Sequence, residues 1–203
     1  MSEASLIGCE VTLVPGSDAL ANDDDGLVSA LASTWSEAYR ASPVPAQRDD
    51  ELYLPERRAE RIAQIRKELE PRSALLAYVR ERGEVVAFFW GLSLADLEGV
   101  AAEKAADIRP FALQPVERVA YLSMLGVRPS HAKRGLAKVL TRGLCAAFAA
   151  RGATQVLART INELALVRVY KPLGFEEYQR FADPRARNAT RSIFGSRLPL
   201  TSR

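Results

Sequence analysis

Short apolar runs alternate along the chain with segments in which apolar residues return every three or four positions. The runs have the length of β-strands, and the spaced positions mark one face of an amphipathic helix. Strands are predicted at 9–14, 74–80, 84–92, 119–127, 154–160, 175–181 and 192–200. Helices are predicted at 27–40, 55–70, 96–107, 136–151 and 162–171. This mixture predicts the α/β fold class, in a single domain over residues 1–203.

The links between the predicted strands indicate how the strands pair. Glu81-Arg82-Gly83 is a short link that contains a glycine, which suits an antiparallel hairpin. The helix predicted at 136–151 separates the strands before and after it, and these two strands are parallel if the helix is a crossover. The last two predicted strands are expected to pair antiparallel. The sequence therefore predicts a mixed, mostly antiparallel central sheet flanked by helices.

Composition narrows the class of protein without identifying an activity. Of the 203 residues, 48% are hydrophobic and 26% are charged, as in soluble globular domains. A formal net charge of +3 suits an anionic ligand but does not by itself indicate nucleic acid. The two cysteines, Cys9 and Cys145, give no metal-ligand spacing, so we expect no metal. The N-terminal stretch lacks the features of a signal peptide and no apolar run is long enough to span a bilayer, so we expect a cytoplasmic protein without a membrane partner.

The connection between the strand at 119–127 and the helix at 136–151 carries the first candidate site. After Pro129, a small basic loop at 130–135 leads into the helix. The N–H groups at a helix N-terminus lack partners within the helix and attract anions, and Gly135 leaves room for a bulky anion. This arrangement predicts a phosphate-binding site. The alternative is an ordinary strand–helix connection with solvated basic residues.

Two motifs have one common explanation. The first runs through Leu125-Gly126-Val127-Arg128-Pro129 to Ala132-Lys133-Arg134-Gly135-Leu136-Ala137, and the second comprises Asn162 and Tyr170-Lys171-Pro172-Leu173-Gly174-Phe175. In this order they resemble the GNAT superfamily of N-acetyltransferases. The resemblance extends over nearly the whole chain and is most specific between 119 and 181. It implies the acyl-CoA N-acyltransferase fold, in which a parallel, splayed pair of strands lies at the centre of the sheet.

The resemblance also implies an activity, namely transfer of the acetyl group of acetyl-CoA, a cosubstrate, to a primary amine by direct attack. Backbone groups of Leu125, Gly126 and Val127, and the side chain of Asn162, would bind the pantetheine arm. Tyr170 would protonate the departing thiolate as general acid, and a backbone N–H near Leu125 would polarise the carbonyl oxygen. The loop residues implied in binding the pyrophosphate are Ala132, Lys133, Arg134, Gly135, Leu136 and Ala137.

The chain departs from the family pattern in its cofactor motif. Ala132 stands where the family has Gln or Arg, so one phosphate contact is lost or supplied by a neighbour. Asn162 precedes Tyr170 by eight residues where the family pattern has seven. Asn162 is therefore either a cofactor ligand or only a helix cap.

The general base is not identified by a motif, because the strand at 119–127 contains no acidic residue. Glu117 lies just before this strand and is the candidate base, acting through a water. Glu84 and Glu163 are the alternatives, and His131 is interpreted as a loop residue.

The sequence leaves several features of the function open. The same fold could serve as a non-catalytic acyl-CoA-binding sensor or interaction domain. No nucleic-acid partner is expected, because the arginines at 180–197 are scattered. The acceptor amine is not specified, and a homodimer is left open. Four aromatic residues either line an acceptor pocket or belong to the core: Trp35, Tyr39, Tyr53 and Trp90.

Overall fold

One sheet organises the computed structural model, which describes residues 10–23, 26–42, 51–161, 166–182 and 190–200. In these ranges seven strands follow the order β1-β2-β3-β4-β5-β7-β6. They are β1 (Val11–Pro15), β2 (Leu75–Glu81), β3 (Glu84–Ser93), β4 (Val119–Val127), β5 (Gln155–Ile161), β6 (Glu176–Ala182) and β7 (Thr190–Arg197). Neighbouring strands are antiparallel except β4 and β5, which are parallel. The predicted α/β class and the mostly antiparallel sheet with a central parallel pair are confirmed.

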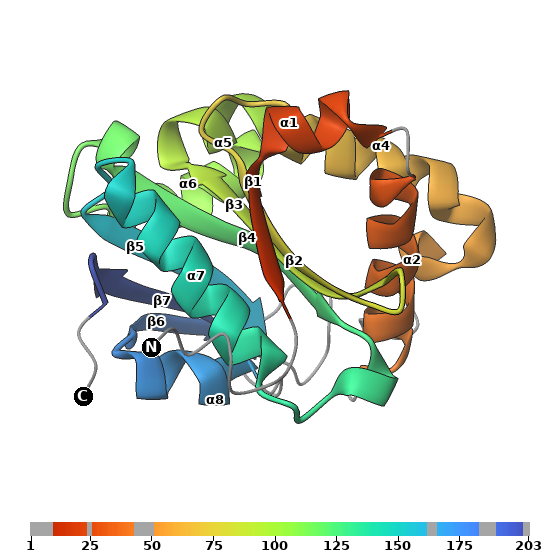
Figure 1. The fold of residues 1–203 in the computed structure, drawn as a ribbon. Coiled ribbons are helices and arrows are strands. Elements are labelled where there is room, and N and C mark those ends of the chain that lie inside the picture. The colour runs from red at the N-terminus through yellow and green to blue at the C-terminus, as the bar shows by residue number, and fades with distance from the viewer. Residues whose placement is uncertain (1–9, 24–25, 43–50, 162–165, 183–189, 201–203) are drawn as a thin grey trace.

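Helices cover both faces of the sheet (Figure 1). They are α1 (Gly16–Ala21), α2 (Leu27–Arg40), α4 (Arg58–Leu69), α5 (Leu94–Val100), α6 (Ala102–Ile108), α7 (Leu136–Ala150) and α8 (Leu166–Tyr170). Successive side chains of a strand point to opposite faces, so Leu75 packs with α7 while Leu76 packs with α2 and α4. We call the side covered by α7 and α8 the α7 face. The side covered by α2, α4, α5 and α6 is the α2 face.

Most predicted elements are present, with ends that differ by one or two residues. β4 occupies the predicted range 119–127, and α7 begins at the predicted residue 136. The predicted hairpin turns at Arg82 and Gly83, whose φ angles of 52° and 84° are those of a type I′ turn. The last two strands pair antiparallel as expected. The start of the predicted helix at 162–171 lies outside the described residues.

Two predicted elements need correction, and one helix was not predicted. The helix predicted at 96–107 is two helices, because Ala101 adopts φ −150° and ψ 71° between α5 and α6. The final strand spans Thr190–Arg197 rather than 192–200, and it lies between β5 and β6. The short helix α1 was not predicted; its N-cap is Pro15, and a proline is compatible with a helix start as well as with the end of a strand.

The central parallel pair separates partway along its length. β4 pairs with β5 only from Val119 to Leu122, although β4 continues against β3 as far as Val127. β5 likewise continues against β7 as far as Ile161. The implied splay is therefore present. We call the space between the diverging ends of β4 and β5 the gap.

A β-bulge marks the point where the gap begins. On β3, Trp90 pairs with Met124 and Gly91 pairs with Leu122, so Ser123 is an extra residue on β4. Bulges re-aim side chains and are frequent beside active sites. Ser123 and Met124 consequently both contact helices of the α2 face.

Candidate active site

The loop between β4 and α7 has an uncommon backbone. Gly135 is the N-cap of α7 with a φ of 80°, and Lys133 also has a positive φ, of 63°. Left-handed residues in such loops turn N–H groups into a concave anion-binding arrangement. Within the described residues no side chain caps α7, so the first N–H groups of the helix face outward. Lys133, Arg134 and Gly135 are all exposed, as an anion site requires.

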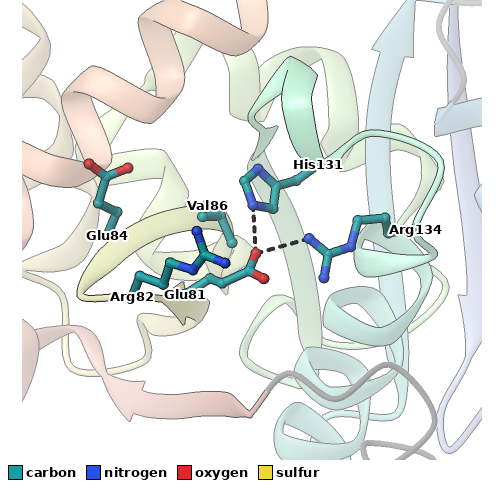
Figure 2. A pocket seen from close by; sticks show the side chains of 6 residues that line it. All are labelled: Glu81, Arg82, Glu84, Val86, His131 and Arg134. Atoms are coloured by element: carbon teal, nitrogen blue, oxygen red, sulfur yellow. Dashed lines mark hydrogen bonds and ion pairs between the residues drawn. The ribbon is translucent and has the colours of Figure 1, made fainter.

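A carboxylate already contacts the cationic side chains of this loop. Glu81, at the end of β2, lies 2.6 Å from His131 Nε2 and 2.9 Å from Arg134 Nη1 through its Oε2 atom. Figure 2 shows the two side chains converging on Glu81 in an open pocket that Arg82 and Glu84 also line. Hydrogen bonds from Arg134 and then His131 lower the pKa of Glu81. Arg134, expected to reach phosphates, is thus held against a carboxylate.

The end of β4 offers backbone groups beside the gap. Leu125, Gly126 and Val127 pair with β3 on one edge, and in the described sheet β5 does not pair with them on the other. Gly126 is required here, because a Cβ atom would come within 2.5 Å of the Phe88 ring. The segment is therefore a strand edge of fixed shape, open to hydrogen bonds from the gap.

Tyr170 lies on the α7 face at the end of α8 and is 1% exposed. Its ring stacks on Phe175 with centroids 4.7 Å apart. Burial raises its pKa well above the ordinary value, and Tyr121, Cys145 and Tyr39 raise it further, so the hydroxyl stays protonated.

The structure does not bring Glu117 together with Tyr170. Glu117 lies in a 3-10 turn before β4 and lines a different open pocket, together with Asp96 and Arg151. The gap begins beyond Leu122, and the six steps from Val119 to Leu125 alone span about 20 Å of extended chain.

Among the described residues, the remaining acidic candidate for the base is Glu84. Glu84 lies on the β2–β3 hairpin and pairs with Arg128. Asn162 and Glu163 lie outside the described residues. His131 is a loop residue, as interpreted, and contacts Glu81.

A buried carboxylate that the sequence did not single out lies at the start of the gap. Glu68 of α4 is 2% exposed. Trp90 Nε1 donates a 2.8 Å hydrogen bond to its Oε2 atom, Ser123 Oγ donates one of 2.5 Å to the same atom, and Lys104 Nζ lies 3.2 Å from its Oε1 atom. We call Glu68, Trp90, Lys104 and Ser123 the Glu68 cluster. The cluster joins α4, β3, α6 and β4 beside the bulge.

The charge of Glu68 is maintained by its neighbours. Burial by itself raises the pKa of this carboxyl, but the Lys104 ammonium and the hydrogen bonds from Ser123 and Trp90 outweigh burial and hold the pKa below its ordinary value. Glu68 was missed because no motif distinguishes it from the many other charged residues of the helix predicted at 55–70. Ser123 offered a signal, as a lone polar residue within an apolar strand.

Of the four aromatic residues that were candidates for an acceptor pocket, three belong to the core and one, Tyr39, lies at its edge. Trp35, Tyr53 and Trp90 are buried in one core cluster on the α2 face. Tyr39 packs against that cluster but is only partly buried, and its hydroxyl donates to Met124 Sδ at 2.8 Å. Tyr39 therefore stands beside the bulge.

The described residues were also considered as a possible metal site or membrane span. They contain no group of three or more His, Cys, Asp or Glu side chains placed to hold a metal ion. Among them there is also no helix with the length and apolar character needed to cross a membrane.

Comparisons with known proteins agree with this architecture. The family model described as acetyltransferase (GNAT) family matches residues 29–175. No curated protein matches the sequence.

Solved structures with the same fold have low sequence identity. An N-acetyltransferase from Staphylococcus aureus Mu50 has a TM-score of 0.64 at 14% identity, over 94% of this chain and 98% of its own. A GNAT superfamily phosphinothricin acetyltransferase from Sinorhizobium meliloti, in complex with acetyl-CoA, has a TM-score of 0.63 at 13% identity, over 94% and 88%. PaiA N-acetyltransferase from Thermoplasma acidophilum, in complex with coenzyme A, has a TM-score of 0.57 at 10% identity, over 93% and 99%.

Proposed function

Since the chain belongs to the acetyltransferase (GNAT) family, we propose that it transfers the acetyl group of acetyl-CoA to a primary amine by direct attack. The observation that carries the proposal is the gap between β4 and β5, which the loop at 128–137 follows directly at the end of β4. Tyr170, buried on the α7 face, is the proposed acid. These parts can bind an anion, a chain with amide groups, and a thiolate that needs a proton.

The residues present fit acetyl-CoA. The pyrophosphate would bind the outward N–H groups at the start of α7, which attract anions, with Lys133 adding a charge. The free edge at Leu125 and Val127 would hydrogen-bond the pantetheine amides, because Gly126 fixes that edge against Phe88. Acetyl-CoA supplies a thioester, whose carbonyl carbon a neutral amine can attack.

The protein's own groups then promote the attack. A backbone N–H near Leu125 would stabilise the oxyanion that forms. Tyr170, kept protonated by burial, would donate its hydroxyl proton to the sulfur as the C–S bond breaks. Holding the amine and the thioester together in the gap supplies a further large part of the rate gain.

Calorimetric titration of acetyl-CoA and free coenzyme A tests the cofactor site. We expect wild type to bind with a dissociation constant of about 10 μM, and Gly135→Glu to lose about 100-fold or more, because the substitution adds strain and a negative charge at the anion site. Gly152→Glu is the matched control. It also replaces a glycine of positive φ, at the other end of α7 and in open space, and it should bind as wild type. Absence of binding by wild type would contradict the proposal.

Release of the coenzyme A thiol in the presence of primary amines tests turnover. The panel comprises 2-phenylethylamine, spermidine, the common amino acids and a tripeptide with a free amino group. Tyr170→Phe should lower kcat by about 10²- to 10⁴-fold and leave acetyl-CoA affinity unchanged. Binding without turnover of any amine would favour a non-catalytic acyl-CoA-binding domain.

A further inference from the structure

The Glu68 cluster lies on the α2 face of the sheet, whereas Tyr170 lies on the α7 face. Leu122 is the last residue of β4 that pairs with β5, and the bulged Ser123 follows it directly. Ser123 is partly exposed, whereas the carboxylate behind it is buried. A substrate can thus reach the Ser123 hydroxyl, but it cannot reach the Glu68 carboxylate to which that hydroxyl is hydrogen-bonded.

The hydrogen bonds fix the orientation of the Ser123 hydroxyl. A serine hydroxyl has one hydrogen to donate and two lone pairs that accept. Its hydrogen goes to Glu68 Oε2, and Lys104 Nζ approaches one lone pair at 3.5 Å, the limit of a hydrogen bond. The Ser123 oxygen can therefore act as a hydrogen-bond acceptor. A group that takes a proton from an amine must be able to accept in this way.

The buried charge of Glu68 is costly to maintain. Removing a carboxylate from water costs several kcal/mol even when it is paired. The chain meets this cost with donors from four elements: Gln64 of α4, Trp90 of β3, Lys104 of α6 and Ser123 of β4. Of these donors, Ser123 is the one that stands at the gap.

We propose that Ser123 and Glu68 form the proton relay that deprotonates the attacking amine, an inference that rests on the function proposed above. As the C–N bond forms, an N–H proton moves to Ser123 Oγ, and the hydroxyl proton of Ser123 moves to Glu68 Oε2. As the C–S bond breaks, the sulfur takes the Tyr170 proton. The products are the amide and the coenzyme A thiol, and Glu68 returns its proton through solvent to the Tyr170 phenolate.

The relay supplies the base that the earlier candidates do not. The described part of β4 carries no acidic side chain, and Glu117 lies at its far end. An attacking nitrogen becomes strongly acidic as it gains positive charge, so a carboxylate of low basicity suffices to accept the proton. The titratable groups that face Glu68 are Lys104 of α6 and Tyr39 of α2, with Tyr121 of β4 close to both. Lys104 keeps Glu68 ionised before the attack.

Ser123→Ala tests the relay directly. It removes one hydroxyl and leaves Glu68 with Trp90 and Lys104, so the fold should persist. We expect kcat/KM for the best amine of the panel to fall about 10²- to 10⁴-fold, mostly in kcat, with acetyl-CoA affinity unchanged. Ser123→Thr keeps a hydroxyl and should retain activity within about fivefold of wild type.

Ser73→Ala is the matched control. Ser73 Oγ also donates to a partly buried carboxylate, that of Asp96, at 2.5 Å, but beside the start of β4 rather than at the gap. It should lower stability somewhat and leave kcat/KM unchanged. Equal losses of kcat/KM in Ser73→Ala and Ser123→Ala would overturn the relay in favour of a structural role.

A second variant examines Glu68 without removing its shape. Glu68→Gln together with Lys104→Met removes the acceptor charge and its counter-ion, so no unpaired charge is buried. The kcat of this double variant should fall as far as that of Ser123→Ala. A triple variant that combines all three substitutions should lose no more kcat than Ser123→Ala or the double variant, because the effects of groups in one relay are not additive.

The outcomes separate the relay from the proposed function. If wild type does not bind acetyl-CoA, the function itself is wrong. If wild type binds and turns over an amine but Ser123→Ala stays within about threefold of it, the relay alone is wrong. If wild type binds acetyl-CoA and acetylates no amine of the panel, the relay is overturned while the cofactor site stands.

Discussion

The cofactor-binding groups that we propose come from one continuous stretch, residues 125–137, and most of them are backbone groups. On the α2 face, the Glu68 cluster brings four side chains together from α4, β3, α6 and β4. The first arrangement can be found in a short motif, because local sequence determines a loop and a helix start. The second depends on tertiary packing, and no motif marks it.

The carboxylates of Glu81 and Glu68 differ in how far they are buried. Glu81 and Glu68 each contact a cation and a second polar partner at hydrogen-bond distance. The Glu81 side chain is 34% exposed and the Glu68 side chain is 3% exposed. Water and salt screen the first pair, whereas the second must be compensated by its partners. Similar contacts should therefore have very different consequences when they are removed.

The largest difference is expected from removing each carboxylate. Glu68→Ala leaves the partly buried Lys104 ammonium and the buried Trp90 N–H without their acceptor, and should lower the free energy of unfolding by about 3–5 kcal/mol. Glu81→Ala should change it by no more than the error of the measurement. Urea denaturation followed by circular dichroism measures both. Similar losses in the two variants would show that burial does not distinguish the pairs.

A smaller effect on the free energy of unfolding is expected at Gly126, which packs against the Phe88 ring. Gly126→Ala places a methyl group against the Phe88 ring, and overpacking of this kind should cost about 1–3 kcal/mol. Gly143→Ala is the control, because its Cβ would meet nothing within 4 Å; it should raise the free energy of unfolding by about 0.5–1 kcal/mol, as alanine favours a helix interior. Thermal denaturation separates the two, and a stabilising Gly126→Ala would contradict the packing argument.

The pH dependence of stability should reflect Glu68. Its pKa is lowered in the folded state, so its stabilising contribution is complete above the unfolded value of about 4.3 and is lost as pH falls through the folded pKa. The difference in unfolding free energy between wild type and Glu68→Gln should be constant from pH 8 to about pH 5 and should narrow below about pH 4. The pKa of Glu177 is also lowered, to about 2, but this group is common to both proteins and cancels. A difference that widens in acid would contradict the assignment.

The sequence predicted those parts whose cause is local. β4 and α7 were placed closely because an apolar run, a proline and helical spacing follow one another within 119–151. The hairpin was recognised because Glu81-Arg82-Gly83 is a short link that contains a glycine, and glycine readily adopts the positive φ that its turn requires. The division between α5 and α6 was missed, because an alanine-rich segment has helical propensity throughout and no residue in it marks a break.

Glu117 stays a prediction, and its position shows why closeness in sequence is a weak guide to closeness in space. Glu117 precedes β4 by two residues, but a strand carries its ends far apart, and the gap opens beyond Leu122. Glu68 lies 55 positions from Ser123 along the chain, and yet its carboxylate oxygen accepts the hydrogen bond that the Ser123 hydroxyl donates. The bulge that turns Ser123 toward α4 is a property of the pairing between β3 and β4. Such a property is visible only once the strands are in register.

The smallest predicted effect concerns Glu81 and the loop it contacts. A phosphate and the Glu81 carboxylate would compete for Arg134 and His131, so Glu81→Gln should bind acetyl-CoA about 2- to 5-fold more tightly at low salt. High salt screens exposed charges, so the gain should disappear there. Glu84→Gln is the matched control, since it removes the same charge from the same hairpin but from a pair with Arg128. Equal gains would reflect net charge alone. Weaker binding by Glu81→Gln would mean that Glu81 instead holds the loop in its anion-binding shape. The exposed Glu81–Arg134 pair would then matter for acetyl-CoA binding much as the buried Glu68–Lys104 pair matters for stability.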